Sequence, residues 1–229
     1  MTEAEKNQRL TAFFQQYVTD HKRDFIERVL AQRTRHITVV LEDIVQSQNA
    51  SAVVRTCECL GLQDIHIIEN QSKYGTNKKV LKGSHHWVDL IRHKGRGRDN
   101  TQACFQYLRE RGYRIVVTDP SPDGRSIWDM PVHQPLALVM GNELHGLSDS
   151  AQAHTDEKVH IPMVGFTESL NISVSSAICL SVLLNKMRQS ADIAWQLPDE
   201  EKDAIRLAWL RNVVRRSDVL EREFLKSIA

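Results

Sequence analysis

Short runs of β-branched and other apolar residues alternate with helical patterns along most of this 229-residue chain. The run Ile37–Leu41 (ITVVL) has the composition of a strand buried on both faces, as in parallel sheets. Because helical patterns separate the runs, their order predicts an α/β fold with a mainly parallel sheet and helices on both faces. Further strands are expected at Asp64–Glu69, Trp87–Ile91, Arg114–Asp119, Leu136–Met140 and Val159–Ile161.

Purely helical patterns precede and follow this alternating region. Residues Glu3–Ala31 indicate two helices, and residues Asp199–Ile228 indicate one long helical stretch. The predicted organisation is a helical amino-terminal extension (1–36), an α/β domain (37–190) and a helical carboxyl-terminal extension (191–229). The arginines of the extensions are explained either by solvated helix faces or by a surface that contacts phosphates.

The composition is that of an ordinary globular protein, with 41% apolar residues, 26% charged residues and a formal net charge of +1. Because there is no overall basic excess, a nucleic-acid partner has to be bound by local patches. Four cysteines without CxxC spacing, and no apolar segment of membrane-spanning length, predict a reduced cytoplasmic protein that contacts no membrane. The histidines show no paired ligand spacing, so no metal site is predicted.

Two basic segments follow predicted strands. The segment Gln71–Gly83 carries four lysines in a polar loop, and the segment Arg92–Arg98 (RHKGRGR) is the densest basic run of the chain. The second segment is either a flexible linker or a loop that contacts phosphates.

The segment Val159–Leu184 predicts a strand, a polar loop and a helix that begins after Asn171. The loop would lie at the carboxyl end of a strand, where open α/β sheets bind ligands. The alternative is that Asn171 or Ser173 merely caps the helix. The fingerprints GxGxxG, GxxxxGK[ST] and GxSxG are absent, which disfavours dinucleotide binding, P-loop chemistry and α/β-hydrolase chemistry.

Two further polar positions follow predicted strands. In the sequence MGNELHGLS, Gly141 allows a close approach of the backbone to a bound group, while Glu143 either supplies a carboxylate or caps the next helix. Arg55 lies near the start of a predicted helix, from which it either reaches the carboxyl edge of the sheet or stays a solvated surface residue.

Three motifs together resemble the knotted SPOUT class of RNA methyltransferases, and within it the TrmH (SpoU) family of tRNA guanosine 2′-O-methyltransferases. They are NASAVVRTCECLG at Asn49–Gly61, LVMGNELHGL at Leu138–Leu147 and IPMVGFTESLNIS at Ile161–Ser173. The sequence GSHHWV at Gly83–Val88 also fits, and the resemblance covers about residues 25–188. Each motif alone would be weak, but the three in this order are specific.

The resemblance implies a deep trefoil knot in the carboxyl-terminal half, a homodimer with active sites at its interface, and the cofactor S-adenosyl-L-methionine. Carried over onto this sequence, the cofactor-binding residues are Thr118, Gly141, Ile161 and Leu170. The functional polar residues are Arg55, Asn49, Glu143, Ser169 and Asn171. We expect Arg55 to stabilise the attacking 2′-oxygen, because a guanidinium is a poor general base but a good partner for developing negative charge.

The implied substrate is tRNA, with the D-loop guanosine favoured because about 36 residues before the first strand are too few for a typical RNA-binding domain. Two alternatives remain: methylation of ribosomal RNA, and a non-catalytic RNA-binding protein of the same fold. An α/β oxidoreductase is disfavoured by the absence of a nicotinamide fingerprint.

Overall fold

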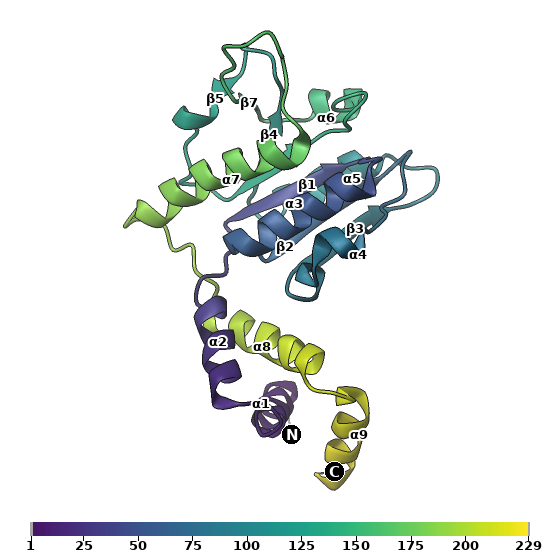
Figure 1. The fold of residues 1–229 in the computed structure, drawn as a ribbon, viewed down its shortest axis with the longest axis vertical. Helices are drawn as coiled ribbons and strands as arrows, with labels where there is room; N and C mark the ends of the chain where they lie inside the picture. The colour runs from purple at the N-terminus through teal and green to yellow at the C-terminus, as the bar shows by residue number, and fades with distance from the viewer. Residues whose placement is uncertain (1, 229) are drawn as a thin grey trace. The chain divides into compact units, whose positions relative to one another are not determined.

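The computed structural model describes residues 2–228, which form two compact units (Figure 1). The sheet unit comprises residues 34–195, and the helical unit comprises residues 2–33 together with 196–228. Among the described residues, no helix is long and apolar enough to cross a membrane.

The sheet unit is built on seven strands in the order β3-β2-β1-β6-β4-β7-β5, and every neighbouring pair is parallel. The parallel α/β fold predicted from the alternating pattern is therefore confirmed. The strands are β1 (Ile37–Glu42), β2 (Asp64–Glu69), β3 (Asp89–Lys94), β4 (Arg114–Thr118), β5 (Arg125–Ser126), β6 (Leu136–Met140) and β7 (Glu157–His160).

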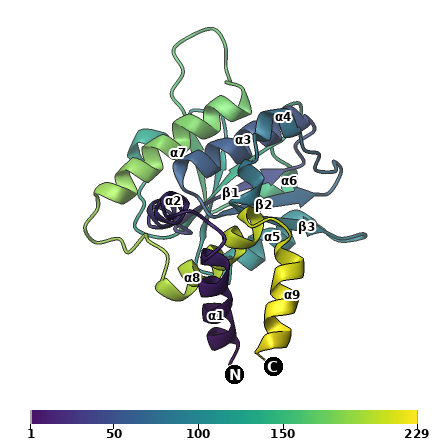
Figure 2. The ribbon, with the colours of Figure 1, turned by 60° about the horizontal axis from the view of Figure 1, so that its bottom comes forward.

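Two apolar clusters cover the two faces of this sheet, because successive strand residues point in opposite directions. Val39 and the residues two positions before and after it in β1 belong to the cluster with α3 (Ser47–Leu60) and α7 (Ile172–Gln189). Val40 belongs to the opposite cluster, with α5 (Asn100–Arg109) and α6 (Asp149–Ala153). Figure 2 shows α3 and α7 side by side on one face. All six residues of β1 are consequently buried, as its composition predicts.

The region between β2 and β3 differs from the sequence prediction. Inside the expected loop Gln71–Gly83, a short helix α4 (Lys78–Leu81) begins where the Asn77 side chain accepts from the backbone N–H groups of Lys79 and Val80. A 3₁₀ turn η1 (Ser84–His86) follows it, so the strand begins at Asp89 rather than at Trp87. The strand therefore includes the first three residues of the predicted basic loop. A second 3₁₀ turn, η2, spans Ile127–Asp129.

The loops that leave the carboxyl ends of these parallel strands meet along one side of the sheet, which we name the carboxyl edge. From the strand order, the loops follow one another as 95–99 after β3, 70–77 after β2, 43–46 after β1, 141–148 after β6, 119–124 after β4 and 161–171 after β7.

Asp43 joins three of these loops. Its carboxylate oxygen Oδ1 accepts hydrogen bonds of 2.8, 2.9 and 3.0 Å from the backbone N–H groups of Asn70, Gln71 and Ser72. Its backbone oxygen accepts from Asn142 Nδ2 at 2.7 Å. Asp43 also has a φ of 49°, a left-handed conformation that aspartate and asparagine tolerate better than most residues. The residue thus fixes the carboxyl edge from β2 to β6.

We expect Asp43→Ala to lower the free energy of unfolding by about 2–4 kcal/mol, because three backbone donors lose a charged acceptor and alanine tolerates the positive φ poorly. The matched variant is Asp43→Asn, which keeps an oxygen at the same place and the same backbone tolerance. Urea unfolding of both variants measures the difference. Equal losses for alanine and asparagine would contradict this role of the side-chain oxygen.

The helical unit contains four helices, and one sequence prediction for it was wrong. The stretch Asp199–Ile228 is not continuous: it is broken after helix α8 (Asp199–Val213), where Val214 is extended and Arg216 has a φ of 57°. This break brings Phe224 onto Phe13, with ring centroids 4.3 Å apart, so α9 packs against α1 as Figure 2 shows. The helices are α1 (Glu3–Gln15), α2 (Asp20–Leu30), α8 (Asp199–Val213) and α9 (Ser217–Ser227).

Candidate functional site at the carboxyl edge

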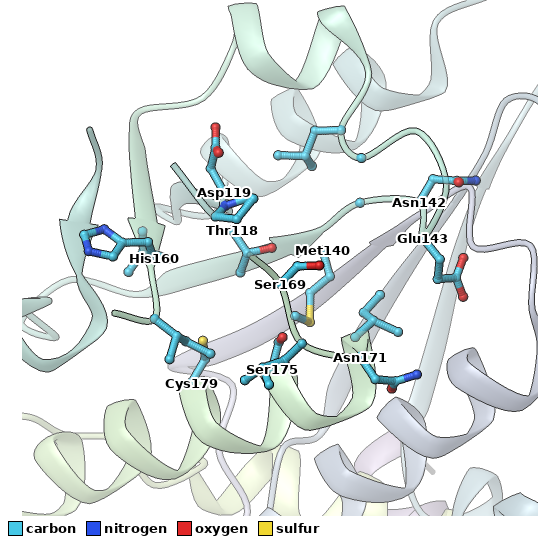
Figure 3. A pocket seen from close by; sticks show the side chains of 18 of the residues that line it. Thr118, Asp119, Met140, Asn142, Glu143, His160, Ser169, Asn171, Ser175 and Cys179 are labelled. Atoms are coloured by element: carbon cyan, nitrogen blue, oxygen red, sulfur yellow. The ribbon is translucent and has the colours of Figure 1, made fainter. Parts of the chain in front are cut away.

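A cavity of about 480 Å³ lies at the carboxyl ends of β4, β6 and β7 (Figure 3). The loops after these strands, the first turn of α3 and the amino-terminal part of α7 form its walls. A volume of this size is within the usual range for small-molecule and cofactor sites. The cavity is lined by both polar and apolar side chains, so it offers hydrogen bonds as well as an apolar surface to a ligand.

Eight of the nine site residues predicted from the sequence line this cavity, although they come from four separate segments of the chain. The predicted polar residues among them come from the start of α3, the loop after β6 and the loop after β7. The eight are Asn49, Thr118, Gly141, Glu143, Ile161, Ser169, Leu170 and Asn171.

A chain of hydrogen bonds joins the three sequence motifs inside the site. Glu143 Oε1 accepts from Asn49 Nδ2 at 2.9 Å, and Asn49 Oδ1 accepts from Asn171 Nδ2 at 3.2 Å. Glu143 Oε2 also accepts from the backbone N–H of Val45 at 3.3 Å. The carboxylate therefore links the loop after β6 to the loop after β1 and to the start of α3, and Asn49 extends the chain of hydrogen bonds to the start of α7.

The structure resolves the alternatives that the sequence left open for the helix starts. Asn171 does cap α7, because its Oδ1 accepts from the backbone N–H of Ser173 at 2.9 Å, while its Nδ2 bonds to Asn49. Glu143 caps no helix. The cap of α6 is Ser148, and the helix begins at Asp149.

Gly141 is required by a close approach of two backbone segments. A Cβ built on Gly141 would lie 2.6 Å from the backbone carbon of Gly146 and 2.7 Å from the nitrogen of Leu147. Side chains essentially never come that close to backbone atoms. The loop 141–148 can therefore fold back over the end of β6 only with glycine at this position.

Sequence reasoning missed several residues that line the cavity: Asp119, Met140, Leu147, His160, Ile172, Ser175 and Cys179. For Asp119, burial opposes the charged form, but hydrogen bonds from the Ser121 N–H and from Lys158 outweigh it and lower the pKa. The carboxylate is thus an acceptor for hydroxyl or amine groups. Met140 is the last residue of a predicted strand, so it could have been found by including the final residue of each strand among the candidates. Cys179 lies two turns into α7, and the sequence gives no such signal for it.

Arg55 is the predicted site residue that does not line the cavity. It is exposed on α3, six residues after Asn49. Six residues turn a helix by about 600°, which places Arg55 on a face of α3 different from that of Asn49. Within one chain, the guanidinium and the cavity are not brought together.

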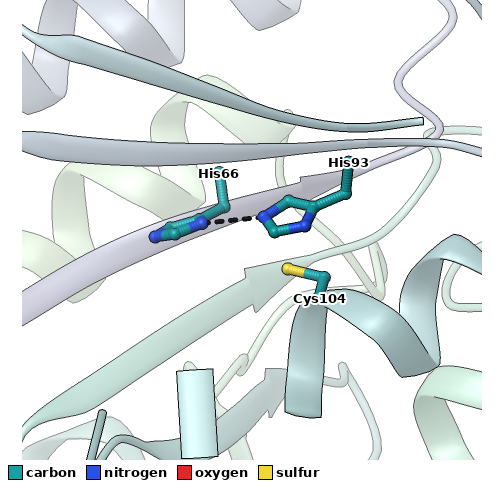
Figure 4. A group of neighbouring side chains, drawn as sticks. All are labelled: His66, His93 and Cys104. Carbon is teal, nitrogen blue, oxygen red and sulfur yellow. Dashed lines mark hydrogen bonds between the residues drawn. The ribbon is translucent and has the colours of Figure 1, made fainter. Parts of the chain in front are cut away.

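A second group of titratable side chains, separate from the cavity, lies between the sheet and α5 (Figure 4). His66 Nδ1 and His93 Nε2 are hydrogen-bonded at 3.0 Å, and the ligand-type atoms of these residues and Cys104 all lie within 4.8 Å of one another. A thiol has to lose its proton to bind a metal ion, but burial raises the pKa of Cys104. Arg98 and Arg111 add positive charge, which further disfavours a cation, so we assign this group to packing.

The buried pair predicts a loss of stability in acid. Burial, with His93 and Arg111 adding to it, lowers the pKa of His66 to about 3, and burial and Arg98 also lower the pKa of His93. Below the unfolded-state pKa of about 6.5, these histidines bind protons in the unfolded chain but stay neutral in the folded chain. The free energy of unfolding therefore falls by up to about 1.4 kcal/mol per pH unit for each histidine. The loss for His66 continues as the pH falls from about 6.5 towards about 3.

We therefore expect the unfolding free energy to fall less steeply between pH 6 and pH 5 for His66→Gln than for the wild type, by about 1 kcal/mol. His133→Gln is the matched control, because His133 is exposed. Denaturant titrations at both pH values give the slopes. Identical slopes for wild type and His66→Gln would show that His66 accepts a proton freely in the folded protein.

The fold and the site define an α/β protein with a ligand cavity at the carboxyl edge of a parallel sheet, assembled from three separate polar motifs. The model of the SpoU rRNA methylase family matches residues 36–181. The chain belongs to this family.

Known relatives resemble the chain over most of its length. A protein named tRNA (guanosine(18)-2'-O)-methyltransferase from Borreliella burgdorferi is 41% identical over 205 residues, covering 90% of this chain and 91% of that protein. The solved structure of a TrmH/SpoU tRNA modifying enzyme from A. aeolicus has a TM-score of 0.74 at 29% identity, covering 85% of this chain and 98% of that one.

A more distant structure shares the fold. The SpoU methyltransferase AviRb from Streptomyces viridochromogenes, solved in complex with the cofactor AdoMet, has a TM-score of 0.60 at 22% identity. The match covers 72% of this chain and 65% of that one.

Proposed function

We propose that this protein methylates the ribose 2′-hydroxyl of guanosine 18, in the D-loop of tRNA, with S-adenosyl-L-methionine as methyl donor. The observation that carries the proposal is the 41% identity, over 90% of the chain, to a relative named for this reaction. The three motifs of the family all lie at one cavity, which further supports a methyltransferase. The cytoplasm, where tRNA is found, is the proposed location.

The cavity fits the proposed cofactor. Its volume of about 480 Å³ is suited to a molecule of this class, and the close packing at Gly141 leaves backbone rather than side chain at the wall. Thr118, Gly141, Ile161 and Leu170 would hold the cofactor, with the backbone of their loops supplying polar contacts. When bound, S-adenosyl-L-methionine supplies an electrophilic methyl group on its sulfonium.

The polar residues of the site would orient the substrate ribose. Glu143 and Asn49 hold the loops through the hydrogen-bonded chain described above, so they act by positioning. Ser169 lines the cavity and is exposed, so its hydroxyl is available to the ribose or its phosphate. The alignment of the 2′-oxygen with the methyl group depends on these contacts, because transfer requires an in-line approach.

We further propose that the protein is a homodimer in which Arg55 serves the cavity of the partner subunit. Two observations support this arrangement. Arg55 does not reach its own cavity, and the loop after β7 exposes Val164 and Phe166 almost completely, at 105% and 109% of their reference areas. Apolar side chains this exposed, together with Leu144 at 72%, are typical of a surface that a partner covers.

The decisive experiment is methylation of unmodified tRNA and of ribosomal RNA with labelled cofactor, followed by nuclease mapping and mass spectrometry. A methyl group on the ribose of tRNA guanosine 18 is the expected result. Methylation of ribosomal RNA alone would establish the alternative that the family description suggests. RNA binding without any transfer would indicate a non-catalytic RNA-binding protein.

A further inference from the structure

The segment 71–98 concentrates positive charge that the chain as a whole does not show. It contains eight lysines and arginines but a single acidic residue, Asp89, whereas the formal net charge of the entire protein is +1. Asp89 does not neutralise its neighbours, because its carboxylate pairs with Arg35 at 2.9 Å. The excess therefore belongs to one region of the sheet unit.

Six of these eight cations are exposed and take part in no ion pair among the described residues. Two of the eight are used within the fold: Arg92 forms a two-pronged pair with Glu69 at 2.7 and 2.9 Å, and Arg98 donates to Asn100 and to the backbone of Lys94. We name the other six the basic rim. They are Lys73, Lys78, Lys79, Lys82, Lys94 and Arg96.

The basic rim begins at the same side of the sheet as the cavity. Lys73 is in the loop after β2, and Lys94 and Arg96 lie at the end of β3 and in the loop that follows it. Three strand spacings separate β3 from β6, which is about 14 Å. Asp43 holds the loop 70–72 and also accepts from Asn142 beside the cavity, so the two regions are fixed to each other.

The chemistry of this surface fits a nucleic-acid backbone better than another protein. Protein interfaces centre on exposed aromatic and aliphatic side chains, and the segment 71–98 has no large hydrophobic residue that is exposed. Polyanion interfaces instead need separated cations that stay free to contact successive phosphates. Gly95 and Gly97 on either side of Arg96 leave its backbone adaptable.

We propose that the basic rim binds the phosphodiester backbone of the RNA substrate as it continues from the nucleotide in the cavity. This inference rests on the proposed function, because it assigns the path of that substrate. The rim contributes to affinity and not to the chemical step, since its cations follow strands β2 and β3, whereas the cavity lies at the ends of β4, β6 and β7.

The test measures the binding of unmodified tRNA transcript between 50 and 300 mM KCl, roughly the range in which counterion release dominates affinity. Two variants remove rim charge while keeping a polar side chain: Lys94→Gln with Arg96→Gln, and Lys73→Gln with Lys78→Gln and Lys79→Gln. The control is Arg109→Gln with Arg111→Gln, which removes two charges outside the rim. Arg109 ends α5 and Arg111 follows it, and α5 runs back towards the opposite edge of the sheet. Because Arg109 pairs with Asp156 at 2.6 Å, circular dichroism also has to show that this control variant keeps its fold.

For the Lys94 and Arg96 double variant we expect the slope of log affinity against log salt to decrease by about 1–2, and affinity at 100 mM salt to fall about tenfold or more. The KM for tRNA should rise accordingly, while kcat at saturating tRNA and cofactor affinity stay at wild-type values. The Arg109 and Arg111 control should keep the wild-type slope.

The assignment would be overturned if both rim variants, with folds shown to be intact by circular dichroism, kept the wild-type slope and affinity. The rim would then be better explained as a surface for an acidic protein partner. Weakened RNA binding without methyl transfer by the wild-type protein would overturn the proposed reaction but retain the rim as an RNA-binding surface. The two failures are therefore distinguishable.

Discussion

Replacing Arg55 with alanine is expected to lower kcat for tRNA methylation by about 10²–10³-fold, the usual effect of losing one donor to a developing oxyanion. Cofactor affinity should stay at the wild-type value, because the proposed partner of the guanidinium is the 2′-oxygen of the substrate and not the cofactor. Single-turnover transfer and calorimetric titration of S-adenosyl-L-methionine measure the two quantities. Loss of cofactor binding would contradict the role given to the guanidinium.

Cys59→Ala is the matched control for this substitution, since Cys59 is exposed on the same helix one turn later. It should leave both kcat and cofactor affinity unchanged. A drop equal to that of Arg55→Ala would indicate a general effect on α3.

Mixed dimers decide whether Arg55 acts on the partner's cavity. A dimer of one Arg55→Ala subunit and one Glu143→Ala subunit would contain one complete site if the arginine crosses the interface, because the intact Glu143 and the intact Arg55 then meet. Its activity should be about half that of the wild type by this count of sites. If both groups act within one subunit, each site carries a defect and the mixed dimer is inactive.

The second large effect is expected for Gly141→Ala. The new Cβ would lie 2.6–2.7 Å from backbone atoms of Gly146 and Leu147, so the loop 141–148 has to move. We expect the unfolding free energy to fall by about 1–3 kcal/mol and cofactor affinity to weaken about 10–100-fold, because small displacements at a site are costly. Urea unfolding and cofactor titration give both numbers.

Gly165→Ala provides the comparison, because the nearest atom to its added Cβ is the nitrogen of Thr167 at 4.0 Å. Its stability should stay within about 0.5 kcal/mol of the wild type. If Gly141→Ala behaved in the same way, the close packing over the end of β6 would not be what the cavity requires.

The strands at the centre of the sheet were predictable from the sequence because burial on both faces leaves an apolar run, as in β1 and β6. The edge strand β3 was misplaced, since its exposed residues Arg92 and Lys94 flank a single buried residue, His93, and resemble a basic loop. The break between α8 and α9 was missed because no glycine or proline marks it, and Arg216 itself takes the left-handed conformation.

The motifs predicted eight residues that line the cavity, whereas they did not predict the contacts between these residues. The hydrogen bonds join Asn49 to Glu143 across 94 positions of sequence and to Asn171 across 122 positions. Only the fold therefore reveals that the three side chains form one hydrogen-bonded network. Asp43 was overlooked, because the position of a single aspartate after a strand does not indicate which backbone groups its side chain contacts. The trefoil knot stays a prediction from the resemblance.

The two ends of the sheet unit meet: Thr34 Oγ1 donates to the backbone oxygen of Trp195 at 2.6 Å across 161 positions of sequence. Both connections to the four terminal helices consequently leave the sheet unit at neighbouring positions, after residue 195 and before residue 34. Exchange of the helical unit for another sequence would therefore alter the chain only outside these two positions and would leave the order of the strands unchanged.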